Sequence, residues 1–393
     1  AFLGGPLHFL SELKAAFIRT LNLDDEHAIT PENSHLFAAI GSALNYKEDV
    51  ETTLGSLQQR LSTGIKLEFE VARLDPLFAS QEDYDAFTSR HGNNHVETGD
   101  LKNYSGNCYL GIDAGSTTTK IVVMQTGNSD YKVVFSNYER HHADQLKSVL
   151  EILKKFDEKM PGQKVRVCLT GSGAKPIAES VGVPFAQEVA ANAIALQKKY
   201  EKVGTAIELG GQDAKMIFFK ESETDHMRSV SDMRMNGSCA GGTGAFIDEI
   251  ASVLKVPVEE FNALAAKGEH VYDISGRCGV YAKTDIQPLL NQGAAKEDLA
   301  LSAFHAIAKQ TIGGLAQGLE IESPVAFEGG PLTFNPVLVR VFSERLQLEK
   351  EDILIPEHPE LMIATGAALS LKEMFAGSKK VAVADILKKL EQI

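Results

Sequence analysis

The sequence predicts an α/β fold, and three segments carry this prediction. CYLGIDAGSTTTKIVVMQ, from Cys108, and TAIELGGQDAKMIFF, from Thr205, each show an apolar strand, a Gly-rich polar turn and a second strand. VRVCLTGSGAK, at Val165–Lys175, shows a buried strand that ends in a Gly-rich turn before a helix. Strands and helices that alternate along one chain are typical of α/β domains.

The composition excludes several classes of function. The 393 residues would form roughly two or three folding units. Acidic residues outnumber basic ones 53 to 39 and no basic run is longer than a pair, which argues against a nucleic-acid binder. No stretch approaches the ~20 apolar residues of a membrane-spanning helix, and four cysteines are too few for a disulfide scaffold. We therefore expect a cytoplasmic protein that binds neither nucleic acid nor membrane.

The chain repeats part of itself. Phe2–Leu44 aligns without a gap with Phe327–Leu369, and roughly 40% of the aligned positions are identical. Both copies show a Gly-Gly-Pro turn, an amphipathic helix, a Pro-containing loop and a helix of small residues. The residues that precede the second copy have no counterpart before the first. We expect residues 1–45 to be the C-terminal remnant of a preceding copy in a longer protein, the alternative being a vestigial half-domain.

Two further segments read as connections. Residues 46–106 form a connector, with helical spacing at Val50–Leu61, strand-like alternation at Ile65–Leu74 and a polar turn or linker at Tyr84–Asp100. Residues 377–393 predict a C-terminal helix or linker, because VAVADILKKLEQI again has helical spacing.

The first Gly-rich turn suits a phosphate group. A glycine lets the backbone approach a ligand, and successive amides around it form an anion-binding concavity. Hydroxyls add donors, a lysine adds positive charge and an aspartate can hold a hydrated Mg²⁺. The turn supplies these groups from Asp113, Gly115, Ser116, Thr117, Thr118 and Lys120. The alternative for this turn alone is an ordinary Ser/Thr-rich hairpin.

A second turn of the same kind strengthens the phosphate interpretation. We align Gly210, Gly211, Gln212 and Asp213 with the four residues Asp113–Ser116, and Lys215 then follows as Lys120 does. A Gly-Gly-Pro turn at Gly329, Gly330 and Pro331 opens a helix later in the chain.

This ordered set resembles the superfamily of sugar kinases, actin and Hsp70-like ATPases. The resemblance implies two ribonuclease H-like lobes, each a five-stranded sheet with flanking helices, and ATP in the cleft between them. It places lobe I at 107–202, lobe II at 203–358 and a closing helix that returns to lobe I at 359–376. Gly329, Gly330 and Pro331 would then flank the adenosine.

Two cysteines occur in equivalent settings. Cys239 and Cys278 each precede a Gly-rich turn and a helix, where unpaired amides and the helix dipole stabilise a thiolate or an anionic cluster. Cys108 and Cys168 lie in strands and are expected to be packing residues. A [4Fe–4S] cluster normally takes four thiolates, so a two-fold dimer that shares one cluster is one solution. A disulfide or a shared Zn²⁺ site are the alternatives.

With these cysteines the motif set resembles the activators of 2-hydroxyacyl-CoA dehydratases and the related ATPase subunits of benzoyl-CoA reductase. The motifs are GIDAGSTTTK, IELGGQDAK, NGSCAGGTGAF, GRCGVYAKTD and GGPLTFN. The resemblance implies a homodimer with a [4Fe–4S] cluster between the subunits, held by Cys239 and Cys278, and an ATP–Mg²⁺ site in each subunit. ATP hydrolysis would drive transfer of a low-potential electron to a partner iron–sulfur dehydratase or reductase. A ferredoxin- or flavodoxin-like protein would be the donor.

The resemblance also assigns roles at the nucleotide. Asp113, Ser116, Thr117, Thr118 and Lys120 would serve phosphate and Mg²⁺, and Gln212 and Asp213 would lie near the γ-phosphate and its attacking water. Two positions are open: Glu188 either faces the cleft or is a solvated helix-start carboxylate, and Asn192 stands where the family pattern leads us to expect a histidine. A small-molecule kinase and a nucleotide-dependent regulatory or scaffold domain remain the rival functions.

Overall fold

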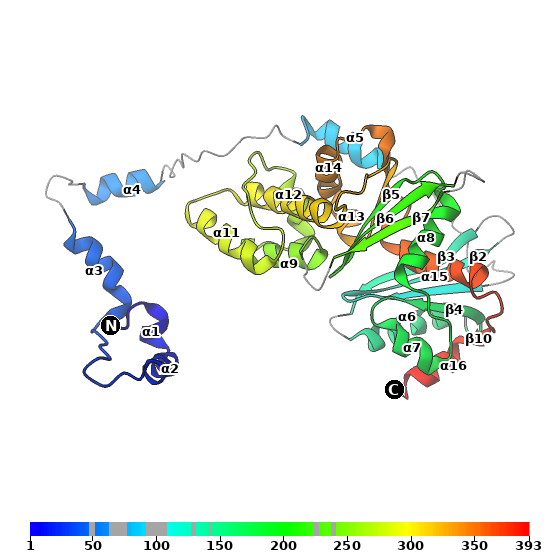
Figure 1. Ribbon diagram of the computed structural model, residues 1–393, viewed down its shortest axis with the longest axis horizontal. Coiled ribbons are helices and arrows are strands. Elements are labelled where there is room, and N and C mark those ends of the chain that lie inside the picture. The colour runs from blue at the N-terminus through cyan, green and yellow to red at the C-terminus, as the bar shows by residue number, and fades with distance from the viewer. Residues whose placement is uncertain are drawn as a thin grey trace. The chain divides into compact units, whose positions relative to one another are not determined.

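The computed structural model describes residues 1–46, 52–62, 77–91, 108–126, 131–141, 144–222, 228–236 and 241–392 (Figure 1). The chain divides into two compact units, Ala1–Lys66 and Leu67–Ile393, and each is described by itself. Among the described residues, none of the helices has both the length and the apolar character needed to cross a bilayer. The strand predicted at Ile65–Leu74 lies outside the described residues.

The first unit is helical. Its elements are α1 (Gly5–Phe9), α2 (Ser11–Leu21), a 3₁₀ turn at Ser34–Leu36, α3 (Phe37–Leu44) and α4 (Leu54–Ser62). The first four match α13 (Gly330–Phe334), α14 (Pro336–Arg345), the 3₁₀ turn Pro359–Leu361 and α15 (Met362–Glu373) of the second unit, in the order that the repeat predicts.

The repeat extends to the backbone conformation. Gly4 and Gly329 share a φ of 90° at the start of each copy. Their amides donate matching hydrogen bonds of 3.0 Å, to the carbonyl of Ser34 and to that of Pro359. Because such a φ favours glycine, the backbone explains why both copies keep glycine there.

The two copies differ in burial. Leu13 and Phe17 of α2 are 39% and 43% exposed, whereas their counterparts Leu338 and Phe342 in α14 are fully buried. The same side chains that form a core in the second copy therefore form an apolar surface in the first.

The second unit contains two five-stranded sheets that share the topology of four strands, whereas the fifth strand is antiparallel to its neighbour in the first sheet and parallel to it in the second (Figure 1). In each, an antiparallel three-stranded meander is followed by a strand parallel to its first strand. The first sheet has the order β10-β4-β1-β2-β3 and the second β7-β6-β5-β8-β9. The strands of the first are β1 (Cys108–Ala114), β2 (Thr118–Thr126), β3 (Tyr131–Arg140), β4 (Lys164–Thr170) and β10 (Val381–Ala382). Those of the second are β5 (Thr205–Leu209), β6 (Ala214–Glu221), β7 (Arg228–Met235), β8 (Val325–Glu328) and β9 (Ile353–Leu354).

Helices cover these sheets and join them. Lobe I is the first sheet with α6 (Gln145–Lys159), α7 (Ala174–Val181) and α16 (Val383–Leu390). Lobe II is the second sheet with α9 (Gly244–Leu254), α10 (Phe261–Ala265), α11 (Gly279–Asn291), α12 (Lys296–Leu315), α13 and α14. The helices α8 (Glu188–Lys199) and α15 lie between the two sheets. They approach closely, since a Cβ at Gly366 would lie 1.7 Å from the Ala191 carbonyl oxygen.

The structure differs from expectation at residues 81–91 and adds detail at the C-terminal segment. Within the polar linker expected at Tyr84–Asp100, the structure places helix α5 (Gln81–His91), which docks on lobe II through buried Phe87. Asn262 Nδ2 also donates to Tyr84 Oη at 3.1 Å. The C-terminal segment is part of lobe I, because β10 pairs with β4 and Val383 of α16 is buried in that core. In both segments a helix packs against a lobe through buried apolar side chains, Phe87 on lobe II and Val383 in lobe I.

Candidate functional site

A cleft between the lobes is the candidate site. Its volume is about 390 Å³, within the usual range for a small-molecule site. Lobe I contributes the turn between β1 and β2 and the end of β3, and lobe II contributes the turn between β5 and β6, the start of α9 and the Gly-Gly-Pro turn. The predicted residues that line it are Thr117, Thr118, Lys120, Gly210, Gly211, Gly329, Gly330 and Pro331.

The other predicted nucleotide residues lie beside the cleft and do not line it. Asp113, Gly115 and Ser116 form the base of the first turn, and Gln212 and Asp213 lie on the outer side of the second, with Gln212 exposed. The two turns touch: a Cβ at Gly211 would lie 2.0 Å from Thr117 Oγ1.

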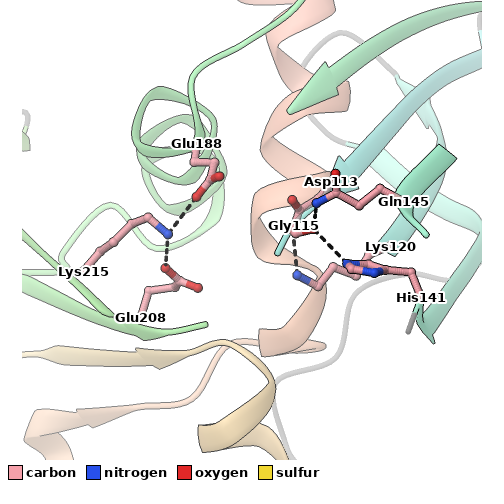
Figure 2. Close-up of polar contacts among 8 residues, drawn as sticks. All are labelled: Asp113, Gly115, Lys120, His141, Gln145, Glu188, Glu208 and Lys215. Carbon is pink, nitrogen blue, oxygen red and sulfur yellow. Dashed lines mark hydrogen bonds and ion pairs between the residues drawn. The ribbon is translucent and has the colours of Figure 1, made fainter. Parts of the chain in front are cut away.

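Each turn is built on a buried acid–lysine pair (Figure 2). In lobe I, Lys120 Nζ donates to Asp113 Oδ2 at 2.7 Å. In lobe II, Lys215 Nζ donates to Glu208 Oε2 at 2.8 Å and lies 2.7 Å from Glu188 Oε2. Glu188 therefore belongs to this network, and of the two alternatives the solvated helix-start carboxylate is excluded.

The structure corrects the alignment of the two turns. The Gly115 amide donates to the Thr118 carbonyl at 3.0 Å, and the Gly210 amide donates to the Asp213 carbonyl at 2.7 Å. Gly210 is thus the counterpart of Gly115 and not of Asp113. The true counterpart of Asp113 is Glu208, which precedes its lysine by the same seven residues. That equal spacing is the sequence signal that would have revealed Glu208.

Burial and ion pairing set the charges of these groups. Burial acts to lower the pKa of Lys120, but Asp113 outweighs it and the pKa is raised. Burial likewise opposes the charge of Lys215, but Glu208 and Glu188 raise its pKa well above its usual range. Both lysines therefore carry a positive charge at neutral pH, Lys120 at the cleft and Lys215 in the interior of lobe II.

A further buried acid lies next to Glu208. Glu328 ends β8 and is paired in register with Glu208 on β5. Its side chain is 0% exposed, and neither carboxylate oxygen has a hydrogen-bond partner among the described residues. Burial raises the pKa of Glu328 to about 8, and the neighbouring Glu208 carboxyl adds to the shift. Asn192 is buried too, so this position is part of the interior beneath the cleft.

Two residues that the sequence interpretation passed over hold the first turn in place. Gln145 Nε2 donates to the Gly115 carbonyl at 2.7 Å, and His141 Nε2 lies 3.1 Å from the same oxygen (Figure 2). Neither belongs to a local motif, because α6 and the end of β3 reach the turn only in the folded chain.

The Gly-Gly-Pro turn borders an aromatic slot. A Cβ at Gly330 would lie 2.6 Å from Tyr138 Oη, so a larger residue here would displace this lobe I side chain. The rings of Tyr138 and Phe334 lie 5.5 Å apart between centroids, and both line the cleft. The two rings are inclined at 66° and form an apolar slot beside the glycine turn, which suits a planar ring.

Gly241, two residues after Cys239, lies against the turn that carries Cys278 in lobe II. Cys278 is partly buried and occupies the N-cap of α11. Cys239 lies outside the described residues, but a Cβ at Gly241 would lie 2.3 Å from the carbonyl oxygen of Arg277. Gly241 therefore touches the residue that precedes Cys278. In the part of the chain that the structure describes, no group of three or more metal-ligating side chains is present.

The other cysteines are buried in lobe I. Burial raises the pKa of Cys168 to about 12, which leaves it as an inert thiol.

Comparisons with known proteins agree with this architecture. The family model of the BadF/BadG/BcrA/BcrD ATPase family matches residues 110–370. An uncharacterized protein of Methanocaldococcus jannaschii is 30% identical over 265 residues, 66% of this chain and 99% of its own. The (R)-2-hydroxyglutaryl-CoA dehydratase activating ATPase of Acidaminococcus fermentans is 28% identical over 221 residues, 56% of this chain and 82% of its own.

A solved structure gives the same result. The activator of 2-hydroxyisocaproyl-CoA dehydratase from Clostridium difficile, with bound ADPNP, superposes with a TM-score of 0.59 at 26% identity, covering 70% of this chain and 99% of that one. The predicted two-lobed actin-like fold is confirmed, and so is the predicted resemblance. The chain belongs to the BadF/BadG/BcrA/BcrD ATPase family.

Proposed function

We propose that this protein is an ATP-dependent activator that transfers low-potential electrons to an iron–sulfur acyl-CoA dehydratase or reductase. The observation that carries the proposal is a helix, α9, that joins the nucleotide cleft to the cysteine turns. The relatives named as dehydratase activators support the class of partner.

ATP would bind with its phosphates at the two turns and its base at the Tyr138–Phe334 slot. Thr117, Gly211 and Lys120 line the phosphate end, and ADPNP in the related activator supports a nucleotide at this place. Lys120 now neutralises Asp113. When Lys120 turns to the phosphates, Asp113 is free to hold a hydrated Mg²⁺.

Hydrolysis would involve the outer side of the second turn. Gln212 and Asp213 are the groups that we assign to the attacking water. Because they lie beside the cleft in this structure, we infer that they reach the water only when the lobes close over the γ-phosphate.

Helix α9 would transmit the nucleotide state. The amides of Gly244 and Ala245, in its first turn, donate to the carbonyls of Gly210 and Gly211 at 2.9 and 2.8 Å. Further along the helix the Glu249 carboxylate fills the space beside Gly279, where a Cβ would lie 1.7 Å from Glu249 Oε2. Gly279 follows Cys278. A movement of the second phosphate turn therefore changes the position of α9 and of the cysteine turn.

We infer that Cys239 and Cys278 would hold one edge of a [4Fe–4S] cluster. Cys278 lies at a helix N-terminus, and its thiol makes no capping hydrogen bond. Gly241, which follows Cys239, contacts Arg277, the residue before Cys278. Two thiolates are half of the usual four, so a second copy of the chain would supply the others. When bound, the cluster supplies a one-electron reservoir that a ferredoxin- or flavodoxin-like donor fills and the partner enzyme empties. We place this chemistry in a reducing cytoplasm, where free thiols persist.

We also propose the domain layout that the sequence predicts. Residues 107–202 and 203–358 form the lobes, and 359–376 return to lobe I. Residues 1–45 belong to another copy of this ATPase type, which the matching elements and exposed apolar side chains of Phe2–Leu44 support.

Anaerobic purification and reconstitution with iron and sulfide test the proposal. We expect a brown protein with about four irons per dimer. Cys278→Ser should lose the iron and keep ATP binding, whereas Cys108→Ala, a change at a buried thiol in lobe I, should keep both. A protein that stays colourless after reconstitution, or one that takes zinc in place of iron, would overturn it.

A further inference from the structure

An ion pair joins the two lobes across the cleft. Arg140, the last residue of β3 in lobe I, binds Asp248 on α9 of lobe II. The contact is bidentate: Nη1 donates to Oδ2 and Nη2 donates to Oδ1, each at 3.2 Å. The partners are 108 residues apart, and both line the cleft.

The geometry distinguishes this pair from an ordinary surface ion pair. The side chains are 50% and 35% exposed, so the charges alone contribute little to stability. Two parallel hydrogen bonds between planar groups, however, fix the orientation of one partner against the other. An orientation constraint that crosses the cleft holds only while the lobes keep their present separation.

Asp248 lies on a helix that also contacts the second phosphate turn and the Cys278 turn. On the same helix, Gly244 contacts the second phosphate turn and Glu249 contacts Gly279 beside Cys278. Helix α9 is thus attached to lobe I, to the phosphate turn and to the cysteine turn within two turns of its own length. A rigid helix attached at three points cannot follow one of them without affecting the other two.

We propose that Arg140 and Asp248 are a positioning pair that lets α9 respond to lobe closure, so that the exposure of Cys278 depends on which nucleotide is bound. The inference rests on the proposed function for the nucleotide but not for the cluster or its partner. Closure over ATP changes the separation of the lobes, breaks the pair and releases α9, and loss of the γ-phosphate lets the lobes return to the present separation, at which the pair holds α9.

The test measures alkylation of Cys278 in the full chain without iron. Wild-type protein is treated with iodoacetamide in saturating ADP or a non-hydrolysable ATP analogue, and the Cys278 peptide is followed by mass spectrometry. We expect the two rates to differ by about fivefold or more, the lower range of common couplings between sites. Calorimetry establishes that each nucleotide is bound in each variant.

The variants isolate the pair. In Asp248→Asn and Arg140→Gln the two rates should become nearly equal, and the charge exchange Arg140→Asp with Asp248→Arg should restore part of the difference. Arg140→Lys keeps the charge without the bidentate geometry and should give an intermediate ratio. Arg340→Gln breaks the Arg340–Glu344 pair within α14, so it serves as the matched control with the wild-type ratio.

The outcomes separate this inference from the proposed function. A wild-type ratio that persists in Asp248→Asn and in Arg140→Lys overturns the role of the pair and leaves the activator proposal intact. Equal rates in the wild type with both nucleotides bound overturn the role of the pair and the coupling through α9 together. Failure to bind iron bears on the activator proposal alone, because no iron is present in this experiment.

Discussion

Replacing Glu328 by glutamine should change how stability depends on pH. Glu328 is fully buried beside Glu208, and burial raises its pKa from an ordinary value of 4.5 to about 8. In the unfolded chain this carboxyl loses its proton near pH 4.5. Between the two pKa values the folded protein therefore binds one proton more than the unfolded chain.

This extra proton stabilises the folded protein at low pH. The stabilisation is fully present below about pH 4.5 and is lost as the pH rises through about 8, at about 1.4 kcal/mol per pH unit. Between about pH 5 and pH 7.5 the wild type should lose about 3 kcal/mol of unfolding free energy relative to Glu328→Gln. The substitution itself also changes the unfolding free energy, by an amount that does not depend on pH. The test is therefore how the difference in unfolding free energy between wild type and Glu328→Gln varies with pH.

Urea unfolding at several pH values measures this pH dependence of the unfolding free energy. Far-ultraviolet circular dichroism is the signal, because the chain has no tryptophan to serve as a fluorescent reporter. Wild type and Glu328→Gln are compared at several pH values, with Glu320→Gln, at an exposed carboxyl in the same lobe, as the control. A difference between wild type and Glu328→Gln that stays constant over this range would refute the assignment of a buried, protonated Glu328.

Two further predictions concern the phosphate turns. Lys215→Met leaves the carboxylates that flank it without a cation, so it should lower the unfolding free energy by about 3–5 kcal/mol, and adding Glu208→Gln should recover part of the loss in urea titrations. No recovery in the double variant would contradict the pairing. Gly211→Ala places a methyl group against Thr117 and should weaken ATP binding by about tenfold or more in calorimetry. Gly313→Ala, in α12 with open space around it, should bind ATP normally, and equal affinity in both variants would show that the turns do not need to touch.

Much of the fold was accessible from the sequence because local signals specify it. The strand–turn–strand units and the Gly-Gly-Pro turns lie where the pattern predicts, and Cys278 lies at a helix N-terminus as expected. The repeat predicted four elements of the first unit in order, because the same glycine and apolar positions recur in both copies.

The errors arose where a pattern depends on tertiary contacts. The glycine alignment did not identify Glu208 as the counterpart of Asp113, because the role of Glu208 is set by Lys215 on the neighbouring strand. Helix α5 looked polar because Phe87 is one apolar side chain in a charged segment, and its burial depends on lobe II.

The interlobe contacts could not be predicted at all. Arg140 and Asp248, or Glu188 and Lys215, belong to no common motif and meet only when the lobes fold. Their sequence neighbours give no sign of charge pairing, so only the structure reveals which acid each cation selects.

The most direct test of coupling between the cleft and the cysteine turns is a comparison of midpoint potentials. The reconstituted protein would be titrated anaerobically with saturating ADP and with a non-hydrolysable ATP analogue, binding of each being verified first. Because α9 connects the phosphate turn with the Cys278 turn, we predict that the two nucleotides give different potentials. Identical potentials with both nucleotides bound would contradict the coupling.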